Sequence, residues 1–189
     1  MAVPAEQVVS DPAEQLILVD AQDNQLGVMS KAQCHAGNGV LHRAFSVHLI
    51  DPQGRLLLQQ RSADKPLWPL YWSNSCCSHP RADEQMAQAT ERRLWQELGV
   101  RCQPSYLYKF QYQARYGEQG AEYELCSVYI GHFDGNLSIN RTEVAATRLC
   151  TPAQLDALVA DGNAGITPWF AMEWRYLRQH FAERLLPCG

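Results

Sequence analysis

A thiol and an imidazole stand two positions apart in the run Trp72-Ser-Asn-Ser-Cys-Cys-Ser-His-Pro80. The thiol belongs to Cys77 and the imidazole to His79, and a helical pattern that follows ends in Gln96-Glu97-Leu98-Gly99. Acid–base, nucleophilic and metal chemistry all use a thiol, an imidazole and a carboxylate. Cysteine and histidine at this spacing also occur in zinc sites and in inert cores. The spacing alone does not choose among these alternatives.

Two carboxylates, Glu122 and Glu124, are separated by one residue in a strand-like run. Because side chains alternate along a strand, both lie on the same face as Cys126 and Val128. If that face is buried, the carboxylates must be paired or metal-bound. If the strand end is frayed, both are solvated, and the pattern favours neither alternative.

Three histidines could join these glutamates in a metal site: His35, His42 and His79. Together with Glu122 and Glu124 they would make a complete oxygen and nitrogen site for Mn, Mg, Zn or Fe. The seven-residue gap from His35 to His42 is not diagnostic. The spacing alone is therefore a weak indication of a metal site.

Four cations lie in different segments around the same region: Arg61, Lys65, Arg92 and Arg93. They could converge on an anionic substrate, where arginine offers bidentate contacts to phosphate. The alternative for Arg93 is an ordinary helix pair with Glu97, four residues later. That alternative does not account for the two loop cations.

The composition predicts one globular domain. The chain has 189 residues, of which 46% are hydrophobic and 19% charged, and its net charge is −4. The acidic balance weighs against nucleic-acid binding, and no apolar run approaches the roughly 20 residues of a membrane-spanning helix. The first thirty residues lack Lys and Arg, so the basic start of a signal peptide is absent. Seven cysteines without an export signal favour reduced thiols and a cytoplasmic protein.

Strands and helices are expected in mixed order after a loose leader at residues 1–15. The expected strands are 16–19, 42–50, 55–61, 106–114 and 122–133, and the expected helices are 83–98, one from 151, and 169–186. Turns at 51–54 and 116–120 predict two hairpins, and residues 31–40 and 62–69 are expected to be loops. The last helix carries Trp169 and Trp174, which are more often core residues than ligand contacts. This order predicts an α+β fold, a layered α/β/α domain with a mixed sheet.

The segment at 83–99 resembles a Nudix box. In that motif a glycine and a glutamate precede Arg-Glu-x-x-Glu-Glu-x-Gly, and the tail here is Arg92-Arg93-Leu-Trp-Gln96-Glu97-Leu-Gly99. Arg93 and Gln96 replace two glutamates that would hold Mg²⁺ against a pyrophosphate. A Nudix-type pyrophosphohydrolase is therefore the second hypothesis. The third is a non-catalytic metal-binding or RNA-binding module, which the acidic charge disfavours.

These departures match one branch, because the chain resembles the type I isopentenyl-diphosphate isomerases over about residues 16–174. The resemblance implies a single catalytic domain at 16–189 with a Nudix-like core at about 40–174. The motifs that support it are Lys31-x3-His35, His42-Arg-Ala-Phe45, the run 72–80, Arg92-Arg93-x3-Glu97-Leu-Gly, Glu122-Tyr-Glu124-Leu-Cys126 and Thr167-Pro-Trp-x4-Trp174.

The resemblance also implies a role for each matched residue. The expected proton-transfer groups are Cys77 and Glu124, on opposite faces of the substrate. A divalent ion, Mn²⁺, Zn²⁺ or Mg²⁺, is expected at His35, His42, His79, Glu122 and Glu124. A Mg²⁺ ion bound with the diphosphate is expected at Glu97 and the backbone near Cys77. The expected substrate contacts are Lys31, Arg61, Lys65 and Arg93 on the diphosphate, Tyr112 beside Glu124, and Trp174 over the reacting carbons.

The implied reaction converts isopentenyl diphosphate to dimethylallyl diphosphate through a tertiary carbocation, which an aromatic ring can stabilise. The expected partners are these two diphosphates, with no nucleic acid and no membrane, and the expected assembly is a monomer or a homodimer. Three residues depart from the family pattern. Ser78 stands where glycine is usual, Ser73 takes the place of a common threonine, and Cys76 adds a thiol beside Cys77.

Overall fold

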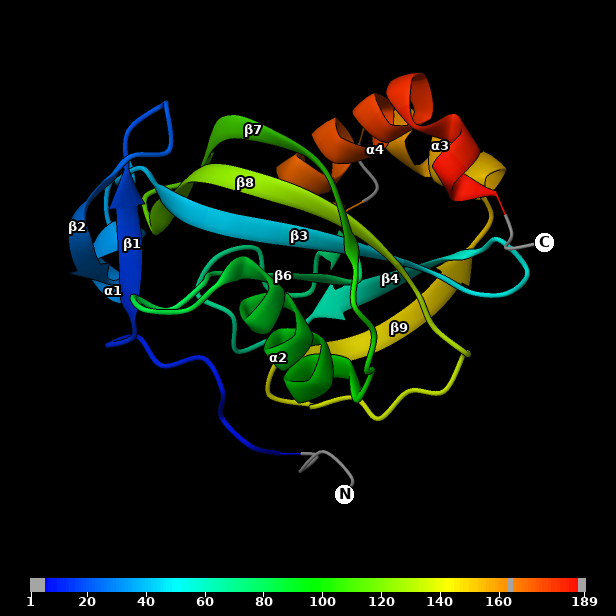
Figure 1. Cartoon of the computed structure of the whole chain (residues 1–189), viewed down its shortest axis with the longest axis horizontal. Coiled ribbons are helices and arrows are strands. Elements are labelled where there is room, and N and C mark those ends of the chain that lie inside the picture. Colours follow the sequence, from blue (N-terminus) through cyan, green and yellow to red (C-terminus); the bar gives the residue numbers. More distant parts are fainter. Residues whose placement is uncertain (1–5, 163–164, 187–189) are drawn as a thin grey trace.

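A single mixed sheet lies between helices on its two faces in the computed structural model, which describes residues 6–162 and 165–186 (Figure 1). Residues 1–5 of the expected leader and 187–189 of the expected domain lie outside the described part. The strands are β1 (Gln15–Val19), β2 (Gln25–Ser30), β3 (His42–Ile50), β4 (Leu56–Arg61), β5 (Trp72–Ser73), β6 (Cys76–Ser78), β7 (Ser105–Tyr116), β8 (Gly120–His132) and β9 (Val144–Cys150). The helical elements are α1 (Lys31–Cys34), α2 (Met86–Leu98), α3 (Pro152–Ala160), α4 (Pro168–His180) and the 3₁₀ turn η1 (Ala182–Leu185).

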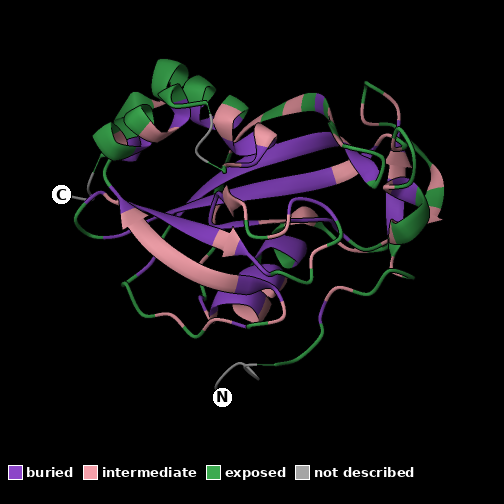
Figure 2. Ribbon diagram, turned by 180° about the vertical axis from the view of Figure 1, so that it is seen from behind, coloured by how far each residue is buried: buried purple, intermediate pink, exposed green. Residues whose placement is uncertain are grey.

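The central strand of the sheet is β3. It pairs in parallel with β8 along its whole length, from His42 opposite Glu124 to Ile50 opposite His132. It also pairs antiparallel with β6 and, at one position, with β1. Figure 2 shows β3 and most of β8 as buried. The strand is covered on both faces, and it combines apolar residues with buried His42, Ser46 and His48, whose polar groups need partners inside the protein.

Alternate residues of β3 pack against different helices. Phe45 and Leu49 belong to a buried cluster that includes Leu94 of α2. Ala44 lies on the opposite face, in the cluster that includes Phe170 of α4. The period of two therefore divides the core into two layers, and the predicted α/β/α arrangement with a mixed sheet is confirmed.

The predicted hairpin of 42–50 with 55–61 is wrong as a strand pairing. The turn itself forms, with the Gly54 N–H donating to the Asp51 carbonyl at 3.0 Å. Beyond it, however, β3 and β4 pair only at Ile50 and Leu56. β4 then turns away to pair with β9 over its length and with β5. The two strands separate because β8 pairs along one edge of β3, while β6 occupies the other edge from Phe45 to Val47.

The predicted hairpin of β7 with β8 is confirmed, with antiparallel register from Ser105 opposite Ile130 to Tyr116 opposite Gly120. Helix α2 begins at Met86, three residues later than predicted, and ends as predicted at Gly99, which has φ +70°. Helix α4 ends at His180, before η1.

Two segments are more ordered than the sequence predicts. The expected loop at 31–40 begins with helix α1. Part of the expected loose leader is held by hydrogen bonds: the Val9 carbonyl accepts from Arg93 Nη1 at 2.9 Å, and the Gln7 carbonyl accepts from Asn140 Nδ2 at 2.7 Å. Both hydrogen bonds join residues far apart in the sequence, so no local pattern predicts them. None of the helices in the described part of the chain is long and apolar enough to cross a bilayer.

Candidate active site and metal centre

Five side chains from separate elements meet at one end of β3. His35 caps α1, His42 begins β3, His79 follows β6, and Glu122 and Glu124 lie on β8. One ligand atom from each lies within 4.8 Å of all the others. The parallel register places His42 directly opposite Glu124, which explains how residues so distant in sequence become neighbours.

Backbone contacts orient two of the imidazoles. His35 Nδ1 lies 2.6 Å from the Lys31 carbonyl, and His42 Nδ1 lies 2.7 Å from the Val40 carbonyl. A carbonyl can only accept, so each Nδ1 carries a proton. His42 Nε2 then keeps its lone pair for the cluster, whereas His35 Nε2 faces the Glu122 carboxylate. The start of β8 comes close to the His35 backbone because residue 120 is glycine. Its φ is +152°, and a Cβ there would lie 2.3 Å from the His35 carbonyl oxygen.

The two carboxylates of β8 point inward, so the alternative of a solvated strand end is wrong. Glu122 and Glu124 are each 8% exposed. Glu122 Oε2 lies 2.7 Å from His35 Nε2, and Glu124 Oε1 lies 3.0 Å from His79 Nε2. Within residues 6–162 and 165–186, His42 Nε2 is buried without a hydrogen-bond partner. Buried carboxylates beside an imidazole lone pair make a donor set compatible with a divalent metal ion.

Burial and mutual repulsion separate the protonation states of the cluster. Burial raises the pKa of Glu124 well above its usual value, and the neighbouring Glu122 adds to the rise. Burial alone would also raise the pKa of Glu122, but the His35 imidazole holds it below its ordinary value. Burial lowers the pKa of His42 to about 4, and burial also holds the pKa of His79 well below its usual value. Neutral imidazoles are the form that binds metal.

Metal removal is expected to destabilise the fold. A ligand that binds only the native state stabilises it by about 2.7 kcal/mol at a concentration about 100 times its Kd. Stripping divalent ions with a chelator should therefore lower the Tm measured by circular dichroism. Adding back Mn²⁺, Zn²⁺ or Mg²⁺, each tested separately, should show which of them restores it. The His42→Gln variant, which loses one ligand, should show a smaller difference. Equal Tm values for stripped and reloaded protein, verified by metal analysis, would contradict a metal site at this cluster.

Cys77 and Glu124 project from strands on the two sides of β3. Cys77 of β6 lies opposite Ser46, and Glu124 of β8 lies opposite His42. Ser46 and His42 share one face of β3, so Cys77 and Glu124 face the same side of the sheet. Burial raises the pKa of the Cys77 thiol to about 12. The Tyr112 hydroxyl donates to Glu124 Oε2 at 2.7 Å, as expected for this tyrosine.

The neighbouring thiol lies on the other face. Cys76 is opposite Val47, is fully buried, and packs in the layer that contains α2. Its Sγ lies 3.5 Å from Glu97 Oε1. The two adjacent cysteines therefore contact different layers, and only Cys77 faces Glu124.

Three of the four predicted diphosphate cations lie close together, and the fourth lies beside the thiol. Lys31 has Lys65 and Arg93 as charged neighbours, and burial together with these cations lowers its pKa to about 8. Arg61 donates through Nη2 to the Leu67 carbonyl at 2.9 Å, and its Nη1 lies 3.9 Å from Cys77 Sγ.

Glu143 is a site residue that the sequence analysis missed. Its Oε2 accepts from Arg93 Nη2 at 3.0 Å and forms a short contact with Lys65 Nζ. Arg93 also donates to Glu97 Oε1 at 2.6 Å, so the predicted helix pair exists but is buried, with Arg93 and Glu97 each 2% exposed. Glu143 lies fifty residues after Arg93, so no local spacing could indicate it. Arg92 instead pairs with Glu84.

The two tryptophans of α4 have different surroundings. Trp169 lies beside the site, because its ring centroid is 6.1 Å from that of Tyr112 and 5.3 Å from Arg61 Cζ. The Nε1 atom of Trp174 donates to Asp156 of α3 at 2.9 Å. Both rings belong to the same buried cluster as Tyr112. Trp169 therefore borders the site next to Tyr112, although the sequence indicated only a core role for it.

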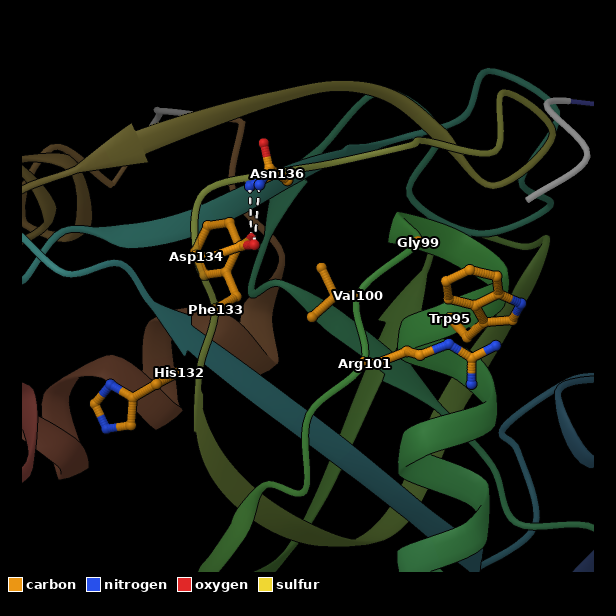
Figure 3. A pocket seen from close by; sticks show the side chains of 8 residues that line it. All are labelled: Trp95, Gly99, Val100, Arg101, His132, Phe133, Asp134 and Asn136. Atoms are coloured by element: carbon orange, nitrogen blue, oxygen red, sulfur yellow. Dashed lines mark hydrogen bonds between the residues drawn. The ribbon is translucent and has the colours of Figure 1, made fainter. Parts of the chain in front are cut away.

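A separate hollow of about 480 Å³ opens at the C-terminal end of α2 (Figure 3). Trp95 and Arg101 line it, with the guanidinium 3.9 Å from the ring centroid, and Asp134 accepts two hydrogen bonds from Asn136. None of the predicted site residues lines this hollow. The candidate active site is therefore the buried cluster at the sheet and not this surface depression.

The fold and a domain match define the class of protein. Residues 40–170 match the NUDIX domain. A protein from Deinococcus radiodurans has a similar structure, with a TM-score of 0.70 over 86% of this chain and 98% of that one, at 23% identity. A MutT protein from Methanosarcina mazei gives a TM-score of 0.62 at 13% identity, covering 75% of this chain and 95% of its own. This is a NUDIX-domain protein.

Curated relatives define the branch. Isopentenyl-diphosphate Delta-isomerase 1 of Photorhabdus laumondii is 39% identical over 91% of this chain and 99% of its own length. Isopentenyl-diphosphate Delta-isomerase of Burkholderia multivorans is 40% identical, over 83% of this chain and 89% of its own. The chain belongs to the isopentenyl-diphosphate Delta-isomerase family.

Proposed function

We propose that the chain interconverts isopentenyl diphosphate and dimethylallyl diphosphate, with Cys77 and Glu124 as the proton-transfer groups. The observation that supports this most directly is their placement on strands that flank β3, facing the same side of the sheet. Between them β3 presents the small side chains of Ala44 and Ser46. A short alkene lying over these residues would have the thiol on one side and the carboxyl group on the other.

The reaction moves two protons and no other atoms. A proton added to the terminal methylene carbon leaves the positive charge on the adjacent tertiary carbon. Loss of a proton from the CH₂ group next to that carbon, on the diphosphate side, forms the new double bond. Burial keeps the pKa of Cys77 and that of Glu124 high, so each group can hold a proton near neutral pH. The direction of the reaction decides which group donates.

Water exclusion protects the cationic intermediate. Tyr112 and Trp169 are 6% and 2% exposed, and their rings form part of the wall. Trp174 is the ring expected over the reacting carbons, but its Nε1 donates to Asp156 of α3. Trp169 lies beside Tyr112 and Arg61 and is the ring proposed to stabilise the cation through its negative face. Tyr112 fixes Glu124 Oε2 by its hydrogen bond, so that the carboxyl group keeps one orientation as it gains and loses a proton.

A divalent ion, Mn²⁺, Zn²⁺ or Mg²⁺, held by His35, His42, His79, Glu122 and Glu124 would offset the buried carboxylate charge and help set the proton affinity of Glu124. The three imidazoles would serve as ligands in their neutral form, and backbone carbonyls orient two of them. Glu122 shares the charge with His35 in the absence of the ion.

The diphosphate is proposed to lie among Lys31, Arg61, Lys65 and Arg93, with a Mg²⁺ ion held through Glu97 and the backbone near Cys77. Lys65 and Arg93 share Glu143 as a counter-ion. A bound diphosphate would therefore compete with Glu143 for Lys65, the less buried of the two cations. Glu97 is held in place by Arg93 and by Gln59 Nε2 at 3.3 Å.

The test is to incubate the protein with isopentenyl diphosphate and Mg²⁺ and to separate the products by chromatography. We expect dimethylallyl diphosphate and no release of phosphate or pyrophosphate. The same sample reports on pyrophosphohydrolysis. Arg93 and Gln96 stand where hydrolases have Mg²⁺-binding glutamates, so release of phosphate without isomerised product would overturn the proposal in favour of hydrolysis.

A further inference from the structure

A second buried acid–base pair lies outside the metal cluster. His48 of β3 and Glu173 of α4 join sheet and helix, with His48 Nε2 2.9 Å from Glu173 Oε2. Their side chains are 1% and 0% exposed. A buried ion pair is weak as a stabilising device, because desolvation offsets much of its attraction and apolar residues of similar volume often serve as well. Stabilisation of the contact between helix and sheet therefore does not account well for this pair, and a role in the site is the alternative.

The position of His48 places this pair on the catalytic face of the sheet. His42, Ser46 and His48 are separated by even numbers of residues along β3, so they share one face. The same face carries Cys77, opposite Ser46, and Glu124, opposite His42. The pair is thus part of the row of polar side chains that contains both proposed proton-transfer groups.

The second oxygen of Glu173 accepts a hydrogen bond from a thiol beside this row. Glu173 Oε1 lies 3.9 Å from Cys126 Sγ, and that sulfur lies 3.5 Å from Ser46 Oγ. Ser46 is the residue opposite Cys77. One oxygen of Glu173 is therefore occupied by His48, while the other faces the neighbours of the reacting groups.

The charge of Glu173 reaches those groups. After burial, which is the larger cause, Glu173 is among the charges that raise the pKa of Cys77 and of Glu124. The Glu173 side chain, hydrogen-bonded to His48, lies in a buried medium of low dielectric, where charges interact strongly. A positive charge that develops on the substrate would be favoured by the field of an ionised Glu173.

We propose that Glu173, fixed by His48, is a positioning residue that stabilises the cationic intermediate through its charge without touching the proton-transfer groups. The inference rests on the proposed isomerisation. It differs from the aromatic stabilisation in that its effect depends on a carboxylate and not on ring contact. A fixed charge aimed at the place where charge develops needs no reorganisation during the reaction.

The test compares two diphosphate probes in wild type and in Glu173→Gln. One probe has a tertiary ammonium in place of the cationic carbon, and the other is saturated isopentyl diphosphate, which is neutral at that carbon. We expect the variant to bind the ammonium probe about ten- to hundredfold more weakly and the saturated probe with little change. The kcat should fall by a similar factor, and KM should change little.

Two further variants separate charge from packing. Glu173→Asp keeps the carboxyl group but withdraws it by one methylene. The ratio of the dissociation constant of the ammonium probe to that of the saturated probe should therefore rise less than in Glu173→Gln. Asp51→Asn is the matched control, because Asp51 is a buried carboxylate paired with Arg55 in the turn after β3, and its ratio should equal that of wild type. The ratio does not depend on the fraction of folded protein, so it remains measurable in a poorly stable variant.

Equal weakening of both probes in Glu173→Gln, or no change in either, would overturn the inference while wild-type turnover continued to support the proposed function. Absence of dimethylallyl diphosphate with wild type would overturn the proposed function and the inference together.

Discussion

The Cys77→Ala variant is expected to lose isomerase activity by about 10⁴-fold or more, the upper end of what one general acid or base contributes. The neighbouring thiol offers no substitute, because Cys76 lies on the opposite face of the sheet. Arg61 Nη1 lies 3.9 Å from the sulfur, but a guanidinium offers only hydrogen-bond donors and cannot take the role of a base. The measurement is conversion of isopentenyl diphosphate under saturating Mg²⁺.

Cys76→Ala is the matched control, since the adjacent thiol is buried on the opposite face against the α2 layer. It should keep most of the activity. If Cys76→Ala lost activity as completely as Cys77→Ala, the assignment of the reacting thiol to the α4 face would be wrong. Circular dichroism on both variants would show whether each retains the fold.

The Glu124→Gln variant is expected to lose activity by about 10²–10⁴-fold, even when divalent metal is present in excess. Glutamine preserves the shape and can still accept from the Tyr112 hydroxyl, which lies 2.7 Å from the present oxygen. It cannot exchange a proton with the alkene. The loss should therefore appear in kcat, with KM little affected.

Glu122→Gln separates metal binding from proton transfer. Glu122 is a predicted ligand of the same ion, and its carboxylate contacts His35, but it has no proposed contact with the alkene. Its activity should recover as the metal concentration is raised, whereas that of Glu124→Gln should not. Recovery of both variants at high metal would show that Glu124 serves only as a ligand.

Local patterns in the sequence predicted the elements better than the pairings. The Thr-Pro start of α4, the Gly99 end of α2 and the β7–β8 hairpin follow from capping and turn chemistry within a few residues. The parallel pairing of β3 with β8 joins residues about eighty positions apart, such as His42 and Glu124. No turn residue indicates that pairing, so the local pattern led to the prediction of a hairpin between β3 and β4 instead.

The site divides in the same way. Glu122 and Glu124 share a face because they are two apart, and that much follows from the sequence. The convergence of three histidines upon them was a weak inference from spacing and a firm one only from family resemblance. Neither spacing nor resemblance predicted the role of Glu143 or the pairing of His48 with Glu173. Glu143 is 50 positions from Arg93, and Glu173 is 125 positions from His48, so no periodicity connects them.

Turnover of isopentenyl diphosphate in D₂O, followed by mass spectrometry and NMR of the product, tests the proposed proton transfer directly. Because Cys77 and Glu124 exchange their protons with solvent between turnovers, we expect deuterium to enter a methyl group of dimethylallyl diphosphate. Product that carries no deuterium, or labelled product that still forms at the wild-type rate in both Cys77→Ala and Glu124→Gln, would contradict the proposal.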